Sequence, residues 1–96
     1  MAMEFTHHES ETKGFFDYKK DEALMGEISY SKVGSNLIII DHTFVDPSLR
    51  GTGTGKALVK AVIDFAKKND LKVIPLCPFA NSIIKREPEF QSVLSA

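Results

Sequence analysis

Residues 45–56 read VDPSLRGTGTGK, and this stretch is the basis for interpreting the segments before and after it. An apolar run over residues 37–45 leads into it and predicts a buried strand. Pro47 ends that strand, because proline has no N–H to give to a sheet. Three glycines follow at positions 51, 53 and 55, and a long amphipathic pattern begins at Lys56. A strand, a glycine turn and a helix start together predict an anion site, because the first N–H groups of a helix are free and its dipole is positive there.

The spacing of the glycines and of Arg50 indicates which kind of phosphate ligand the loop could bind. Arg50 adds a forked cation that suits phosphate. The Walker phosphate-loop pattern fails, because it would need a glycine at position 50 and a hydroxyl at position 57, where Arg50 and Ala57 stand. The dinucleotide pattern fails too, because its third glycine would have to occupy position 56 or 58. The pattern that fits is Arg-x-x-Gly-x-Gly over Arg50, Gly53 and Gly55.

This pattern resembles the acetyl-coenzyme A (acetyl-CoA) pyrophosphate loop of the GNAT superfamily of N-acetyltransferases. Segments 42–47, 74–78 and 88–94 are similar to the minimal single-domain branch of that superfamily, the YjdJ-like type. The resemblance spans nearly all of residues 4–94 and is strongest over residues 37–94. It implies an acetyl-CoA-dependent N-acetyltransferase that acts on an amine acceptor.

Bulk properties set limits on the class of protein. A length of 96 residues predicts one domain, residues 1–96, and the apolar and charged fractions are those of a soluble globular protein. A net charge of −1 gives no reason to expect a nucleic-acid partner. The longest aliphatic run, residues 37–40, is far too short to predict a membrane span. The N-terminus lacks signal-peptide features and one cysteine cannot form an internal disulfide, so a cytoplasmic location is expected.

The segments around the loop predict an α+β fold with a GNAT-like mixed sheet. Runs at residues 3–8, 14–18 and 24–30 precede the strand 37–45, and turn residues separate them, so an antiparallel meander of four strands is expected. A helix over residues 53–69 should bury a stripe formed by Leu58, Ala61, Val62 and Phe65. This helical crossover should make the strand 71–77 parallel to the strand 37–45.

The C-terminal segment predicts a break in pairing and then short helices. Pro75 would cost a central strand one hydrogen bond. In the GNAT fold the corresponding strands diverge at this point and the pantetheine arm of the cofactor inserts between them, so the resemblance implies that no pairing is lost. Pro78 can begin a helix whose buried face is Phe79, Ile83 and Ile84, and a further short helical turn should start at residue 88.

The cofactor site is expected to centre on the loop. Its phosphate cradle comprises Arg50, Gly51, Thr52, Gly53, Thr54, Gly55 and Lys56. The alternative is an ordinary glycine turn before a helix, but three glycines and a forked cation converging on one helix start favour the anion site. The resemblance implies that Phe44 and Val45 act through their backbone, pairing with pantetheine amides and polarising the thioester carbonyl. Pro78, at the next helix start, is assigned to the same site.

Cys77 and His42 are the candidate catalytic residues. The helix start after Cys77 should lower the pKa of its thiol, although a lone cysteine is as readily a small buried hydrophobe. Related small GNAT proteins carry a cysteine here, which implies a role as nucleophile, acid or channel lining. His42 could accept the amine proton or be satisfied within the sheet, and Glu27 is a weaker alternative base.

Three further features bear on activity. The tyrosine that often protonates the departing thiolate in larger GNAT enzymes has no counterpart, because neither Tyr18 nor Tyr30 lies in the C-terminal segment. Only a turn fits between the first two strands, where larger relatives have helices. The acceptor side should therefore be open, which favours a protein tail or another extended amine. No metal is expected at His7 and His8, because adjacent strand residues face opposite sides. A CoA-binding module without turnover and a purely structural domain are the competing hypotheses.

Overall fold

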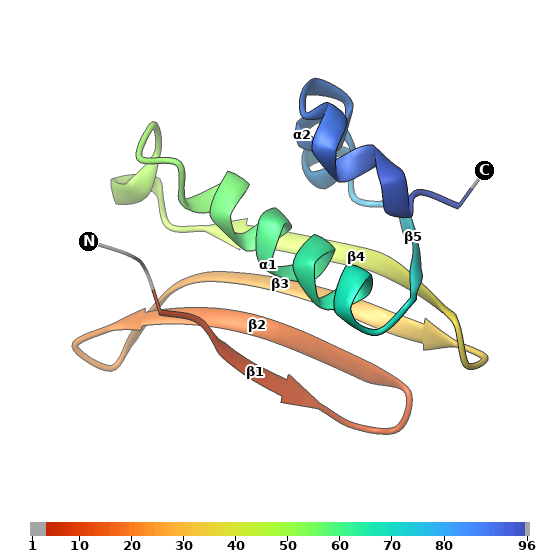
Figure 1. Cartoon of the computed structure of the whole chain (residues 1–96). Helices are drawn as coiled ribbons and strands as arrows, with labels where there is room; N and C mark the ends of the chain where they lie inside the picture. The colour runs from red at the N-terminus through yellow and green to blue at the C-terminus, as the bar shows by residue number, and fades with distance from the viewer. Residues whose placement is uncertain (1–3, 96) are drawn as a thin grey trace.

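The computed structural model describes residues 4–95, which form a five-stranded mixed sheet with helices on one side (Figure 1). The strands are β1 (Thr6–Glu9), β2 (Lys13–Lys20), β3 (Ala23–Val33), β4 (Leu37–Val45) and β5 (Lys72–Pro75). They stand in the order β1-β2-β3-β4-β5, with the first three pairings antiparallel and the last one parallel. The predicted meander with one added parallel strand is confirmed, although residue 3 of the expected first strand lies outside the described residues.

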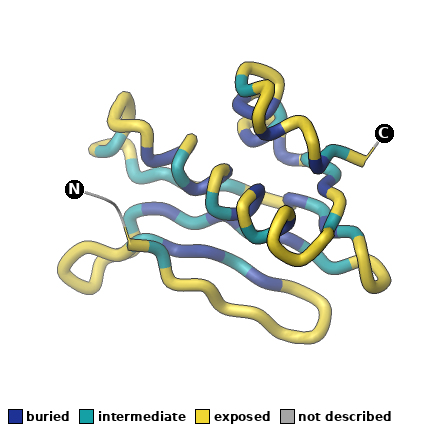
Figure 2. The backbone as a smooth tube through the Cα atoms, in the orientation of Figure 1, coloured by how far each residue is buried: buried dark blue, intermediate teal, exposed yellow. Residues whose placement is uncertain are grey.

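The helical segments are the 3₁₀ helix Pro47–Leu49, α1 (Thr54–Lys68), α2 (Pro78–Arg86) and the 3₁₀ helix Pro88–Val93. In Figure 1, α1 lies along one face of the sheet and α2 stands beside it on the same side. Figure 2 shows buried positions on the strands and on the helix surfaces that meet them. Within residues 4–95 no helix covers the opposite face of the sheet, which is called the uncovered face below. None of the helices in this range is long and apolar enough to cross a membrane.

The core lies between α1 and the sheet. The most deeply buried apolar residues of α1 are Leu58, Val59, Val62, Ile63 and Ala66. The predicted stripe is confirmed at Leu58 and Val62, whereas Ala61 and Phe65 are only partly buried. The buried face is wider than one stripe because α1 packs on the strands and also contacts α2 and the last 3₁₀ helix.

A β-bulge in β4 interrupts the alternation of its side chains. Tyr30 on β3 pairs with Ile40, and Ser29 pairs with His42, so Asp41 is an extra residue between them. Ile40 is fully buried against the helices. Strict alternation would put His42 on that same buried side, but the extra residue moves the His42 side chain to the opposite face of the sheet.

Beyond the bulge, the two faces of β4 carry different residues. Thr43 pairs with the buried Ile28 and therefore lies on the helix side of the sheet, together with Val45. His42 and Phe44 lie on the uncovered face, where both are exposed. The bulge therefore determines that Thr43 and Val45, rather than His42 and Phe44, can reach the site described below.

The strand β5 is shorter than predicted. It ends at Pro75 rather than at residue 77. The N–H groups of Leu76 and Cys77 both donate to the carbonyl oxygen of Ile40, at 3.1 and 3.2 Å. The pairing of β4 with β5 therefore stops at Ile40, and β4 continues beyond it.

The predicted buried face of α2 is wrong at one residue. Ile83 and Ile84 are buried as expected, and Ala80 is buried with them, but Phe79 is 45% exposed. Phe79 lies in the first turn of α2, and its ring lies against Gly55 at the start of α1. The ring therefore faces the space between the two helix starts instead of the core.

Candidate functional site

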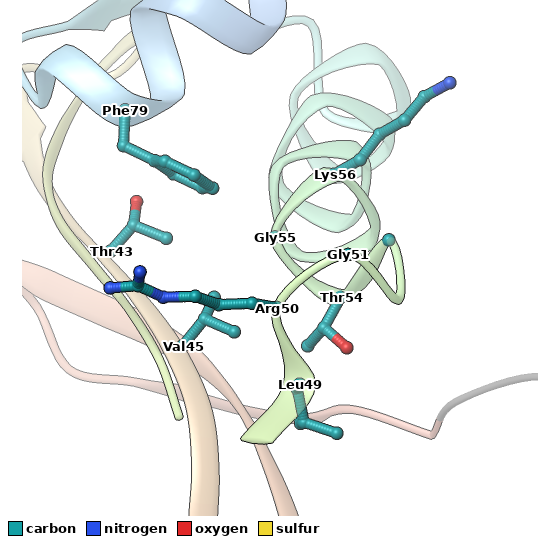
Figure 3. A pocket seen from close by; sticks show the side chains of 10 residues that line it. Thr43, Val45, Leu49, Arg50, Gly51, Thr54, Gly55, Lys56 and Phe79 are labelled. Carbon is teal, nitrogen blue, oxygen red and sulfur yellow. The ribbon is translucent and has the colours of Figure 1, made fainter. Parts of the chain in front are cut away.

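A cleft of about 550 Å³ opens where the end of β4 meets the start of α1 (Figure 3). Ten residues line it: Thr43, Val45, Leu49, Arg50, Gly51, Gly53, Thr54, Gly55, Lys56 and Phe79. They come from β4, from the loop that follows it, and from the first turns of α1 and α2. The volume lies within the range of about 300–1,000 Å³ that is usual for small-molecule sites.

Asp46 folds the first half of the loop. Its carboxylate accepts hydrogen bonds from the N–H and the hydroxyl of Ser48, at 2.9 and 2.7 Å. The hydrogen bond from the Ser48 hydroxyl, with that from its N–H, holds the pKa of Asp46 below the usual value for aspartate. Asp46 thereby caps the short 3₁₀ helix that delivers Leu49 and Arg50 to the cleft.

The three glycines of the loop meet different requirements. Gly51 and Gly53 have φ angles of +78° and +85°, which residues with a side chain rarely adopt. Gly53 is the N-cap of α1 and offers no side-chain hydrogen bond to the first-turn N–H groups. Gly55 has an ordinary φ, but a Cβ there would lie 2.3 Å from the ring of Phe79. The cleft thus contains an open helix N-terminus, where N–H groups and the dipole favour an anion.

The two cations of the cleft are not equivalent. The Lys56 ammonium forms an ion pair with Glu87 Oε1 at 2.9 Å. Among residues 4–95, no carboxylate forms an ion pair with Arg50. Its side chain extends across the cleft toward β4 (Figure 3). Arg50 is therefore the cation that is available to a bound anion.

Cys77 lies behind the cleft wall. It is 7% exposed, and its thiol donates a hydrogen bond to Thr43 Oγ1 at 3.5 Å. Burial raises the pKa of the Cys77 thiol, but hydrogen bonds from the Thr43 hydroxyl and from the N–H groups of Ala80, Phe79 and Thr43 outweigh it, so the pKa is lowered. The lowered pKa that the helix start predicted is confirmed, while the catalytic role of Cys77 stays a prediction.

The structure brings most of the predicted cradle to the cleft. The lining includes Val45, Arg50, Gly51, Gly53, Thr54, Gly55 and Lys56. Thr52 does not line the cleft, and its hydroxyl instead lies 2.8 Å from that of Thr54. Pro78 opens α2 without contributing to the lining. The assignment of these residues to a cofactor stays a prediction.

His42 and Phe44 lie away from the cleft, on the uncovered face. His42 is paired with Ser29, and Phe44 with Glu27, so all of these side chains share that face. Phe44 can still act through its backbone, as the resemblance implies. His42 and Glu27 can accept a proton only from a molecule that reaches the uncovered face.

Sequence reasoning missed Thr43, Leu49 and Phe79 as lining residues. Thr43 was hidden by the bulge, which no alternation pattern reveals. Leu49 could have been found, because it lies inside the loop next to Arg50. Phe79 has the helical spacing of a core residue, and only the position of α2 beside α1 shows where its ring lies.

Comparison with known proteins of similar sequence and structure identifies the family. A model described as GCN5-related N-acetyl-transferase matches residues 4–93. This chain belongs to the GNAT family. Protein NATD1 of chicken, Gallus gallus, is 36% identical over 59 residues, which are 62% of this chain and 54% of that protein. The match thus spans about half the length of this curated relative.

Solved structures share the GNAT fold. A GCN5-like protein from Staphylococcus aureus, determined by NMR, matches with a TM-score of 0.71 and 36% identity, covering 95% of this chain and 88% of that one. An acetyltransferase from Bacillus anthracis in complex with acetyl-CoA matches with a TM-score of 0.58 and 21% identity, covering 69% of this chain and 38% of that one. The second likeness is one of fold alone, and the acetyl-CoA is bound to that protein.

Neither tyrosine of this GNAT chain reaches the cleft. Tyr18 packs edge-on against Phe5. Tyr30 is fully buried, with its hydroxyl 2.7 Å from His7 Nε2 and donating to Glu9 Oε2 at 3.2 Å. Burial, reinforced by Glu9, raises the pKa of Tyr30 far above its usual value. Within residues 4–95, no three His, Cys, Asp or Glu side chains are grouped so as to hold a metal ion.

Proposed function

We propose that this chain is an acetyl-CoA-dependent N-acetyltransferase. The observation that carries the proposal is the cleft at the start of α1, where the glycine loop, the open helix N-terminus and Arg50 meet. N–H groups and a guanidinium suit the pyrophosphate of coenzyme A, because both form charge-assisted hydrogen bonds with phosphate oxygens. Membership of the GNAT family supports the proposal, as does acetyl-CoA bound to the acetyltransferase from B. anthracis.

The pantetheine arm of acetyl-CoA fits beside β4 beyond the end of β5. Pairing between these strands stops at Ile40, so the edge of β4 at Phe44 and Val45 is not joined to β5. Backbone groups at this edge can bond the amides of the arm. An N–H directed at the thioester carbonyl would stabilise the negative charge that develops on its oxygen.

The proposed reaction is direct transfer. The amine nitrogen attacks the thioester carbon, coenzyme A leaves as a thiolate, and water or His42 takes the amine proton. His42 is exposed on the uncovered face, so it would meet an acceptor that approaches from there. Prior transfer to Cys77 is less favourable, because moving an acetyl group from one thiol to another gains little free energy.

The proposed acceptor is an extended amine, such as one on a protein tail. Only residues 10–12 join β1 to β2, and no helix in residues 4–95 covers the face that carries His42. An open face admits an extended chain more easily than it encloses a small metabolite. A free cysteine and a coenzyme A substrate suit a reducing compartment, so the proposal includes a cytoplasmic location.

A coenzyme A-binding module without turnover is the second candidate. One observation favours it: Tyr18 and Tyr30 lie away from the cleft, so neither can protonate the departing thiolate. This module would hold coenzyme A in the same cleft and leave the acetyl group in place.

Transfer of label from acetyl-CoA to peptide and polyamine amines tests the proposal. We expect labelled product with wild type and a strong loss with Arg50→Ala. Binding of acetyl-CoA without transfer to any amine would favour the second candidate, and failure to bind any coenzyme A species would refute both. Mass spectrometry without an acceptor checks the route, because a stable acetyl adduct on Cys77 would replace direct attack with a covalent intermediate.

A further inference from the structure

Thr43 connects the cleft to the single cysteine of the chain. The bulge at Asp41 turns Thr43 toward the helices, where it lines the cleft with Val45 and Phe79 (Figure 3). On its other side, its hydroxyl accepts a hydrogen bond from the Cys77 thiol at 3.5 Å. Cys77 itself does not line the cleft and is 7% exposed. A ligand in the cleft would therefore meet Thr43 before it met the sulfur.

The surroundings of the sulfur suit a thiol that gives up its proton. Cys77 is the N-cap residue of α2, so its sulfur lies beside the positive end of that helix. A helix N-terminus and the Thr43 hydroxyl beside the sulfur both favour its anionic form, and the pKa of the thiol is lowered accordingly.

We propose that Thr43 is a further catalytic residue, whose hydroxyl relays the proton of the Cys77 thiol to the departing coenzyme A thiolate. The proposal rests on the transfer reaction proposed above and supplies the acid that neither tyrosine can provide. Thr43 would touch the leaving sulfur, while Cys77 would act through Thr43 as the proton source. This assigns Cys77 a role that requires no acetylated intermediate.

The proton balance closes without another reactant. When the carbon–sulfur bond of the thioester breaks, the Thr43 hydroxyl gives its proton to the coenzyme A sulfur and takes the proton of the Cys77 thiol. Coenzyme A leaves as a thiol, and Cys77 is left as a thiolate beside the N-terminus of α2 and the Thr43 hydroxyl. The proton released by the amine returns to solvent through water or His42. Cleft water then reprotonates Cys77 through Thr43, so the protein ends as it began.

The hydroxyl of Thr43 can serve both states of the sulfur. It accepts a hydrogen bond from the neutral thiol and, after rotation, donates one to the thiolate. This second orientation is one reason why the pKa of Cys77 is lowered despite burial. A thiol with a lowered pKa gives its proton readily to an ordinary thiolate such as that of coenzyme A.

Thr43→Val, which keeps the shape but removes the hydroxyl, is the main test. We expect kcat to fall by about 10²-fold, the low end for general acid catalysis, because a thiolate is a good leaving group. The Kd of coenzyme A, measured by calorimetry, should change by less than about twofold. Thr43→Ser should restore most of kcat, and Thr6→Val, the same change on the exposed β1, should have no effect. Thr43→Ala provides a smaller replacement if the valine variant does not fold.

The pH profile and a double variant separate a relay from packing. Because the acid must be protonated, wild-type kcat should fall as pH rises through the pKa of Cys77, and this fall should be absent in Thr43→Val. Alkylation of Cys77, the single cysteine, should show a higher thiol pKa in Thr43→Val than in wild type. Cys77→Ala should lower kcat as much as Thr43→Val, and the double variant should be no worse.

The outcomes distinguish this proposal from the one on which it rests. Wild type that transfers acetyl while Thr43→Val keeps its kcat and pH profile would overturn the relay alone. Equal losses in Thr43→Ser and Thr43→Val would also overturn it, because packing would then explain the effect. Wild type that binds coenzyme A but acetylates no amine would overturn the proposed function, and the relay with it.

Discussion

Replacing Arg50 by alanine should raise the Kd of coenzyme A by about 10- to 150-fold. Among residues 4–95 no carboxylate forms an ion pair with the guanidinium, so the variant breaks no internal ion pair and the loss falls on the ligand. Charge-assisted hydrogen bonds contribute about 1.5–3 kcal/mol. At about 1.4 kcal/mol for each factor of ten, this energy gives the stated range.

Lys56→Ala is the matched control for the loss of one positive charge. The Lys56 side chain is 54% exposed and its ammonium lies 2.9 Å from Glu87 Oε1. An exposed charge contributes at most about 1 kcal/mol to an ion pair with any partner, and Glu87 already competes for this one. Loss of Lys56 should therefore raise the Kd of coenzyme A by less than about fivefold. The contrast between the two variants therefore tests the difference between a cation without an ion pair and one that is paired with a carboxylate.

Isothermal titration with coenzyme A and with acetyl-pantetheine measures both effects. Acetyl-pantetheine lacks the pyrophosphate, so Arg50→Ala should leave its affinity unchanged. The difference between wild type and Arg50→Ala should also shrink at high salt, because mobile ions screen an exposed charge. Equal losses in the Arg50 and Lys56 variants, or an unchanged Kd for coenzyme A in Arg50→Ala, would refute the reasoning.

Two further predictions concern glycines. Gly53→Val should leave a folded protein by circular dichroism but raise the Kd of coenzyme A at least about fivefold, because a φ of +85° costs a β-branched residue about 1–3 kcal/mol, and the loop would leave that conformation. Gly53→Asn, which tolerates this conformation, should bind more tightly than Gly53→Val, and equal affinities would contradict the prediction. Gly14→Ala should lower the free energy of unfolding by about 1–3 kcal/mol in urea titrations, because its Cβ would lie 2.3 Å from the buried ring of Tyr30. Gly26→Ala, whose nearest contact is 3.1 Å to Leu58, should cost less than about 1 kcal/mol, and a reversed order would count against this account.

The topology and the loop could be predicted because their signals are local. Pro47 ends β4, the glycines need a turn, and the apolar spacing after Lys56 fits only a helix. A helix between two strands of one sheet then forces a parallel pairing, and the structure has it between β4 and β5. Each of these inferences depends only on residues that are close together in the sequence, so none requires knowledge of the tertiary structure.

The parts that could not be predicted depend on contacts between distant segments. Phe79 has the spacing of a buried residue of α2, yet its ring meets Gly55 because α2 starts beside α1. Val59 and Ile63 are buried on α1 although they lie outside the predicted stripe, because more than the sheet packs against that helix. The residue pattern of one helix does not show where the other helix packs against it.

The bulge at Asp41 has the largest effect on the proposed chemistry. The hydroxyl of Ser31 donates to the carboxylate of Asp41, so the extra residue has its own partner on β3. Because of that residue, His42 lies on the uncovered face and Thr43 on the helix side, although they are adjacent in sequence. A transfer in which acetyl-CoA lies on one side and the amine arrives from the other needs groups of both kinds at one point of the sheet. In the proposed mechanism two consecutive residues of β4 would meet that need, Thr43 beside the leaving sulfur and His42 beside the incoming amine, whereas strict alternation would have reversed the faces of both.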